Sequence, residues 1–179
     1  MAIPDSVTSI GEAVFADCTS LMSVTIGNGV TSIGRGVFAT CTSLTSVTIP
    51  NSVESIGGSV FTNCTGLTSV TIGNGVTSIG NGAFYGCHRL TSVTIPEGVT
   101  SIGEYAFYGC TGLTSVTFSG KDKAKVKGMT YYNWYLDPSC VIHCTDGKYN
   151  IKLFPKESKA LFATSETVVC EKLEGTGVE

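Results

Sequence analysis

Apolar and polar positions repeat along residues 4–118 with a fixed step of 23 residues. A fixed period of roughly 20–50 residues is typical of a solenoid, in which each repeat forms one coil of a stack. Within each repeat, a short segment alternates apolar and polar side chains as a half-buried β-strand does, for example at residues 44–49. The pattern therefore predicts five stacked 23-residue coils with a parallel β-sheet running through the stack.

The strictest columns of the repeat hold Phe, Cys, Leu and Val, together with an Ile-Gly pair such as Ile33-Gly34. The four single-residue columns are Phe15, Phe38, Phe61, Phe84 and Phe107; Cys18, Cys41, Cys64, Cys87 and Cys110; Leu21, Leu44, Leu67, Leu90 and Leu113; Val24, Val47, Val70, Val93 and Val116. A single coil is too short to bury its own apolar face, so these columns must form a continuous core between coils. The glycine after each inward isoleucine indicates a tight bend or a close approach of neighbouring coils.

The pattern Phe-x-x-Cys-x-x-Leu-x-x-Val-x-Ile, clear at residues 61–72, resembles that of the BspA-like leucine-rich repeat family. The resemblance covers residues 4–118 and implies a leucine-rich repeat solenoid. Residues 141–147 are similar to the segment that closes such arrays, and residues 131–134 are similar to the aromatic part of that cap.

We therefore divide the chain into three parts. Residues 1–118 form the leucine-rich repeat array, residues 119–147 form a C-terminal cap, and residues 148–179 form a tail. The tail has two candidate short strands, at residues 149–154 and 167–170.

The same resemblance implies a function. The family is known for bacterial cell-surface and secreted proteins that bind host proteins and other cells. It implies a non-enzymatic adhesion module, at the cell surface or secreted, whose partner is a protein or a glycan. An intracellular repeat scaffold or effector for protein–protein interaction is the alternative. No signal peptide is visible in residues 1–10, and an export signal upstream would separate the two hypotheses.

Composition and motifs exclude several other classes. Charged residues make up 14% of the chain and the net charge is −3, so nothing attracts nucleic acid or anionic lipid. No apolar run approaches the roughly 18 residues of a membrane span, so we expect no membrane insertion. No Gly-x-Ser-x-Gly, Walker or His-Glu-x-x-His motif occurs. We therefore expect no catalytic residues and no cofactor.

Eight cysteines raise the question of disulfides or metal. The five in the repeat column would point in parallel into the core, so they are interpreted as buried reduced thiols that donate weakly to backbone. Cys140, His143, Cys144 and Cys170 lie outside the column with a spacing that zinc could use. Only one such spaced motif is present, so a packed cap with thiols or one disulfide is preferred and no metal is assigned.

Two surfaces are candidates for binding. Outward strand positions form a hydroxyl face, represented by Thr48, Thr71, Thr94 and Thr117. The interpretations left open are a structural threonine ladder, a face for carbohydrate or an extended protein surface, and, less favoured, an ice- or crystal-binding face.

The second surface is an aromatic patch of five tyrosines, which are Tyr85, Tyr105, Tyr108, Tyr131 and Tyr132. Tyrosines are frequent at binding hot spots, and two of these stand where other repeats have alanine or threonine. We expect Trp134 to plug the end of the stack instead. The basic run at residues 121–127 is predicted to be solvated surface.

The N-terminal end is incomplete, because Ile3 resembles the last residue of a strand whose first part is missing. Natural arrays have polar terminal caps. Either the chain is cut from a longer protein, or the open end pairs with a second chain to form a homodimer.

Overall fold

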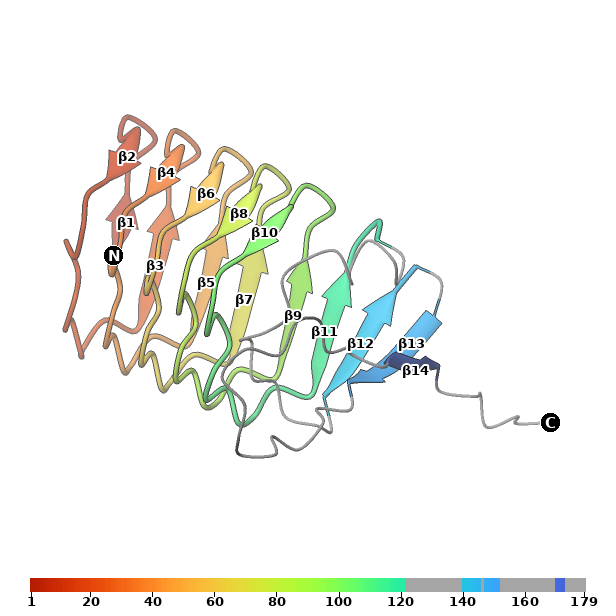
Figure 1. Ribbon diagram of the computed structural model, residues 1–179. Coiled ribbons are helices and arrows are strands. Elements are labelled where there is room, and N and C mark those ends of the chain that lie inside the picture. The colour runs from red at the N-terminus through yellow and green to blue at the C-terminus, as the bar shows by residue number, and fades with distance from the viewer. Residues whose placement is uncertain (122–139, 146, 152–169, 173–179) are drawn as a thin grey trace, which may run out of the picture.

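The alternating Ser-Val-Thr-Ile segment of each repeat forms a short strand, with its serine and threonine outward and its valine and isoleucine buried. The computed structural model describes residues 1–121, 140–145, 147–151 and 170–172. The strands are β3 (Ser23–Ile26), β5 (Ser46–Ile49), β7 (Ser69–Ile72), β9 (Ser92–Ile95) and β11 (Ser115–Phe118). They lie side by side along the stack in Figure 1, and β1 (Ala2–Ile3) pairs with β3 at the N-terminal end.

Wherever the strands of consecutive coils pair, they are parallel and keep the same register. Val47 lies opposite Val70, and Val93 lies opposite Val116, so each residue pairs with the one 23 positions away. We number the coils from one (residues 4–26) to five (residues 96–118). The predicted solenoid of five coils with a parallel sheet is thereby confirmed.

The main sheet loosens between coils three and four. The distance from the Thr91 backbone nitrogen to the Thr68 carbonyl oxygen is 3.5 Å. The matching nitrogen–oxygen distance is 2.9 Å one coil earlier, from Thr68 to Thr45, and 3.0 Å one coil later, from Thr114 to Thr91. The strands accordingly form one sheet that ends at β7 and another that begins at β9.

A second parallel sheet, which the sequence did not predict, runs along the stack. Its strands are only two residues long and consist of the Ser-Ile pair that precedes each Gly. They are β2 (Ser9–Ile10), β4 (Ser32–Ile33), β6 (Ser55–Ile56), β8 (Ser78–Ile79) and β10 (Ser101–Ile102). The Ile-Gly positions, taken from sequence as bends, therefore also carry strand pairing.

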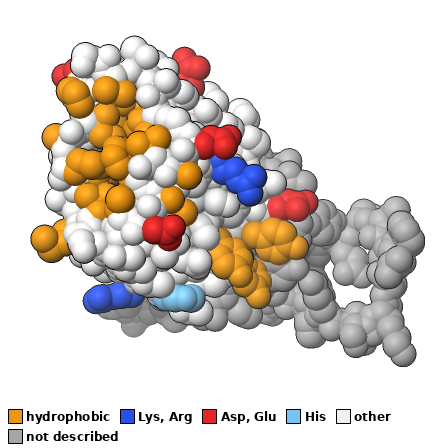
Figure 2. All heavy atoms as spheres, turned by 90° about the vertical axis from the view of Figure 1, so that its left-hand side faces the viewer, with side chains coloured by type: hydrophobic (Ala, Val, Ile, Leu, Met, Phe, Trp, Pro, Cys, Tyr) orange, Lys and Arg blue, Asp and Glu red, His pale blue; other side chains and the backbone are white. Residues whose placement is uncertain are grey.

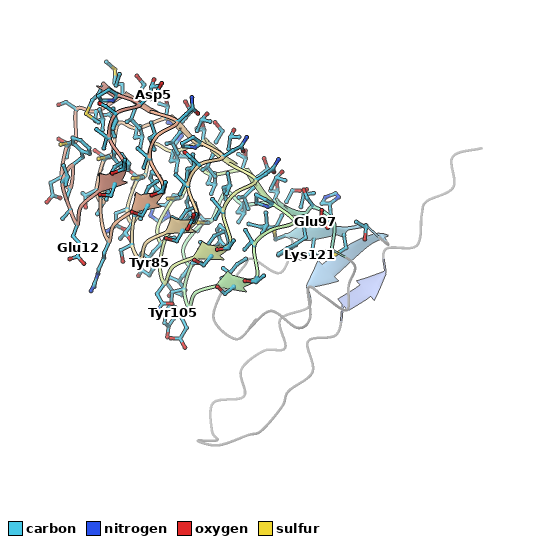
Figure 3. The ribbon with its side chains drawn as sticks, turned by 90° about the horizontal axis from the view of Figure 1, so that it is seen from above. Asp5, Glu12, Tyr85, Glu97, Tyr105 and Lys121 are labelled. Atoms are coloured by element: carbon cyan, nitrogen blue, oxygen red, sulfur yellow. The ribbon has the colours of Figure 1, made fainter. Side chains whose placement is uncertain are left out.

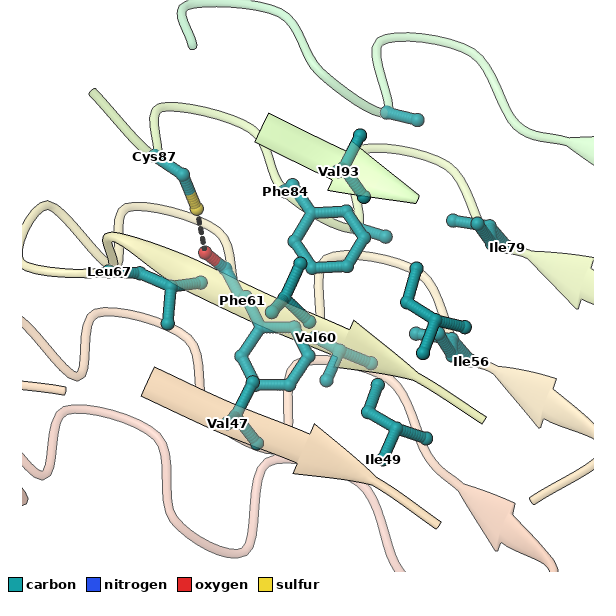
Figure 4. Close-up of a cluster of buried hydrophobic side chains, with 14 of the residues drawn as sticks. Val47, Ile49, Ile56, Val60, Phe61, Leu67, Ile79, Phe84, Cys87 and Val93 are labelled. Atoms are coloured by element: carbon teal, nitrogen blue, oxygen red, sulfur yellow. Dashed lines mark hydrogen bonds between the residues drawn. The ribbon is translucent and has the colours of Figure 1, made fainter. Parts of the chain in front are cut away.

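The core lies between the two sheets and consists of the predicted columns. The rings of Phe38, Phe61 and Phe84 are completely buried and stack with centroids 5.4–5.6 Å apart, nearly parallel. Figure 4 shows the rings of Phe61 and Phe84 with Leu67 and Val93 around them. Only the first coil departs from full burial, because no coil covers Phe15 from outside, and that ring is half-buried.

The glycine after each isoleucine allows the close approach that the sequence indicated. A Cβ atom on Gly57 would lie 2.7 Å from the backbone of Gly34 and Ile33. Gly11, at the same position in coil one, would meet only a valine methyl group at 3.7 Å. The glycine is therefore needed wherever a preceding coil is present.

The ladder continues beyond the fifth coil. β12 (Val141–Cys144) pairs in parallel with β11, with Val116 opposite Ile142, which is 26 residues away instead of 23. β13 (Gly147–Ile151) and β14 (Cys170–Lys172) then pair antiparallel and end the sheet. β13 spans the expected division between cap and tail at residues 147/148, and that division stays a prediction.

The expectation of solvated lysines is wrong for Lys121, the first residue of the basic run. Its side chain is buried, and its Nζ donates a hydrogen bond to the carbonyl oxygen of Glu97, one coil earlier. The other lysines of the run lie outside the described residues.

We expect Gly57→Ala to lower the free energy of unfolding by about 1–3 kcal/mol, because the new methyl group meets immovable backbone. Gly11→Ala, its counterpart without a preceding coil, should change that free energy by less than about 0.5 kcal/mol. Urea denaturation measures both. Equal effects of the two substitutions would contradict the close-contact explanation.

Candidate functional site

Three of the predicted aromatic residues come together on one edge of the stack. Tyr85 and Tyr108 hold the same position in coils four and five, and their rings stack with centroids 5.2 Å apart. Tyr105 meets Tyr108 edge-on at 6.0 Å. All three rings remain about 40% exposed. Figure 3 shows Tyr85 and Tyr105 projecting from the same edge, and we call these three residues the tyrosine cluster.

The backbone under Tyr105 is unusual for a large residue. Its φ is +57°, in the left-handed region, as is φ of Gly82 at the same position in coil four. Every coil adopts this conformation there, the others with Ala13, Gly36 and Ser59. For a residue with a side chain, the left-handed conformation costs roughly 1–2 kcal/mol. A tyrosine at this position therefore carries a backbone conformational cost that a glycine would not.

The tyrosine cluster borders a shallow depression of about 330 Å³. Its lining residues come from coils three to five and are Ser59, Thr62, Asn81, Gly82, Tyr85, Glu104 and Tyr105.

Internal hydrogen bonds already engage part of this lining. The Thr62 hydroxyl donates to the Gly82 carbonyl oxygen at 2.9 Å, and Asn81 Oδ1 accepts from the Glu104 N–H at 3.0 Å. Within the part of the chain that the structure describes, the Glu104 carboxylate has no ion-pair partner, and the residue is exposed.

Other predicted aromatic residues cannot be placed with this cluster. Tyr131, Tyr132 and Trp134 lie outside the described residues, so their membership in the patch and the plug role of Trp134 stay predictions.

The hydroxyl face is divided between two kinds of threonine. Thr68 and Thr114 donate their hydroxyl hydrogens to the carbonyl oxygens of Thr45 and Thr91 in the preceding coil, at 3.0 Å and 3.2 Å. That column is a structural ladder. The predicted column is different: Thr48, Thr71 and Thr94 are exposed, and Thr117 is half-buried. None of its hydroxyl groups has a hydrogen-bond partner among the residues that the structure describes.

The cysteine column forms a ladder of thiol donors. Cys64 Sγ donates to the Phe38 carbonyl oxygen at 3.1 Å, and Cys87 Sγ donates to that of Phe61 at 3.2 Å, which Figure 4 shows. Cys41 and Cys110 make the same bond, whereas Cys18 has no preceding coil and is exposed.

This environment holds the thiols in their protonated form. Burial, with a smaller effect of the neighbouring Cys18 thiol, raises the pKa of Cys41 from 9.0 to about 11. Burial and the Cys41 thiol raise the pKa of Cys64 to about 12. The neighbouring Cys110 thiol, followed by burial, raises the pKa of Cys87. These cysteines are therefore suited to packing and not to nucleophilic chemistry.

The candidate zinc residues are only partly described. Cys140 is buried beside β12, and His143 and Cys144 are half-buried within it, while the Cys170 side chain lies outside the description. Among the described residues, no group of three or more His, Cys, Asp and Glu side chains could hold a metal ion.

The N-terminal end of the stack exposes a patch of apolar side chains, visible in Figure 2. Val14 and Met22 are 55% and 70% exposed, and Phe15 and Leu21 are half-buried. Both sheets also present their first strands without a neighbour at this end. The homodimer through this end stays a prediction.

The geometry of the repeats agrees with a comparison against known families. The model for the BspA-type leucine-rich repeat region matches residues 1–114, in six copies. The chain belongs to the BspA-type leucine-rich repeat family. No curated protein matches it.

Solved bacterial structures resemble this BspA-type array. A leucine-rich repeat protein of T. pallidum is 29% identical with a TM-score of 0.62, and the match covers 65% of this chain and 57% of that one. A leucine-rich repeat protein from Bacteroides ovatus is 30% identical with a TM-score of 0.57, covering 76% and 43%. A leucine-rich cell-surface protein from Faecalibacterium prausnitzii is 32% identical with a TM-score of 0.52, covering 84% and 42%. The chain thus matches less than two thirds of each of these structures.

Membership of the BspA-type family places the chain among repeat proteins that generally serve as non-catalytic protein-interaction modules. In the segments that the structure describes, no helix has the length and apolar character of a membrane crossing.

We expect the raised thiol pKa values to make the BspA-type array less stable in alkali. The unfolded thiols ionise near pH 9.0, whereas Cys41 and Cys64 retain their protons to about pH 11 and 12, so the free energy of unfolding falls as pH rises through this window. Each thiol contributes a slope of about 1.4 kcal/mol per pH unit. Urea denaturation across the window measures it.

Cys64→Ala removes one of these thiols, so the fall in the free energy of unfolding per pH unit should become smaller by about 1.4 kcal/mol. Leu67→Ala, at a fully buried neighbouring position, should lower stability at every pH and leave the slope unchanged. Identical slopes in the two variants would contradict the role of the thiols.

Proposed function

We propose that this chain is the binding module of a bacterial adhesion protein, cell-surface or secreted, and that it binds a protein partner through the tyrosine cluster. The observation that carries the proposal is the clustering of three exposed rings where the repeat pattern changes. Coils one to three hold Ala16, Ala39 and Thr62 at the position of Tyr85 and Tyr108. Aromatic side chains of this kind dominate the free energy of protein–protein interfaces.

The location is supported by the family. A similar solved structure is described as a cell-surface protein, and the BspA-type model matches residues 1–114 of the array. An intracellular scaffold or effector is the alternative. Fractionation of the native organism separates the two, because the adhesion proposal requires the protein in the surface or culture-supernatant fraction.

The hydroxyl face supports a second candidate function, the binding of a glycan. Thr48, Thr71 and Thr94 keep exposed hydroxyl groups that have no partner in the described part of the structure. Thr48 lies opposite Thr71 on paired strands, and Thr94 follows on β9, in the next sheet. A regular array of hydroxyl groups offers hydrogen bonds to a sugar but lacks aromatic anchors. We therefore rank this surface below the tyrosine cluster.

The test measures binding of the purified chain to intact host epithelial cells by flow cytometry. Tyr85→Thr with Tyr108→Thr restores the residue of coil three, and we expect at least about a thirtyfold loss of affinity, as at a hot spot. The matched variant Thr48→Val, Thr71→Val and Thr94→Val removes the hydroxyl face and should bind like the wild type.

The opposite ranking of these two variants would favour the glycan face. A wild-type chain that binds no cells would contradict the adhesion proposal.

A further inference from the structure

We propose that the depression beside the tyrosine cluster is a receptor for a guanidinium group, filled by an arginine side chain that the protein partner presents. This inference rests on the proposed function, because it specifies the chemistry by which the same surface recognises its partner. It depends on the shape of the depression and on its charge.

The depression combines aromatic side chains with a glycine. Tyr85 of coil four and Tyr105 of coil five both line it, and so does Gly82, which has no side chain. A Cβ atom on Gly82 would lie 3.6–3.9 Å from side-chain atoms of Ser59, Tyr85 and Thr62, which also line the depression. The glycine therefore leaves space open beside Tyr85 and Tyr105.

The rings are positioned before any ligand arrives. Tyr108 stacks on Tyr85 and meets the edge of Tyr105, so each ring of the cluster contacts another. Side chains that are already ordered lose less entropy when they bind.

The charge of the site favours a cation. Glu104 lines the depression, and no ion pair within the described residues neutralises its carboxylate. Residues 4–118 contain six acidic side chains and only two basic ones, Arg35 and Arg89, so the surrounding array is also negative. An approaching cation gains from both the local carboxylate and the wider field.

The charge of the lining favours a guanidinium over a neutral sugar. Two polar groups, the Thr62 hydroxyl and Asn81 Oδ1, are already engaged with the Gly82 carbonyl and the Glu104 N–H. The Glu104 carboxylate and the rings of Tyr85 and Tyr105 are the features that a cation would use. A guanidinium group uses both, because it is flat enough to stack on tyrosine and pairs with carboxylates through two parallel hydrogen bonds.

The test uses the full chain and two blocked tripeptides, acetyl-Gly-Arg-Gly-amide and its citrulline counterpart. Citrulline has the same shape as arginine without the charge. NMR titration should show saturable shifts of the Tyr85, Tyr105 and Tyr108 ring signals with the arginine peptide, and at least about tenfold weaker binding of the citrulline peptide. Solvent screens an exposed ion pair, so the ratio between peptides and not the absolute affinity is the readout.

Two variants assign the effect to the site. Glu104→Gln should abolish the preference for arginine over citrulline, and Tyr105→Gly should weaken binding of the arginine peptide at least about tenfold. Because Tyr105→Gly also relieves strain, its midpoint of urea denaturation should stay equal or rise. That result separates lost recognition from lost folding.

Equal binding of the two peptides, or no ring shifts with the arginine peptide, would overturn the guanidinium proposal. If cell binding is still lost in the variant Tyr85→Thr with Tyr108→Thr, the proposed function stands without it. If the arginine peptide binds but the chain binds no cells, the site stands and the adhesion function fails.

Discussion

The structure depends on one constraint: every coil must place its backbone on the previous coil in the same register, 23 residues further along. The Phe61 ring stacks on Phe84, the Cys64 thiol reaches the Phe38 carbonyl, and Gly57 lies against the backbone of Gly34 only in that register. A coil of another length would displace each of these contacts at once. The columns are uniform for this reason, because a change in one coil also alters its contacts with both neighbouring coils.

The sequence predicted what depends on the period and missed what depends on single residues. Coil number, the buried columns and the thiol donors all follow from the 23-residue step. The second sheet could not be predicted, because strands of two residues such as β6 are too short to show alternation. The left-handed backbone conformation at Tyr105 was not predicted, because Ala13 and Ser59 stand in the same column. Gly36 and Gly82 in that column were the residues that could have indicated it. Burial of Lys121 depends on a carbonyl group one coil earlier, which no local charge pattern reveals.

The two ends of the array differ in how their outermost strands are paired. At the C-terminal end, β12 still follows the parallel ladder, and antiparallel β13 then closes it. At the N-terminal end, β1 and β2 have no outer neighbour, Phe15 is covered on one side only, and Cys18 is exposed. Exposed edges of parallel sheets readily accept another strand. The N-terminal face of coil one thus exposes the kind of apolar side chain and strand edge that the later coils cover.

Because register determines so much of the array, departures from the repeat carry more information about function than the repeat does. Thr68 and Thr114 satisfy the backbone of the preceding coil, so their columns are explained by the stack alone. The column of Tyr85 and Tyr108 is different, because coils one to three fill it with Ala16, Ala39 and Thr62 and still stack in the same register. The two tyrosines are therefore a departure from the repeat that register does not impose. We assign the proposed partner surface to coils four and five because this departure occurs there.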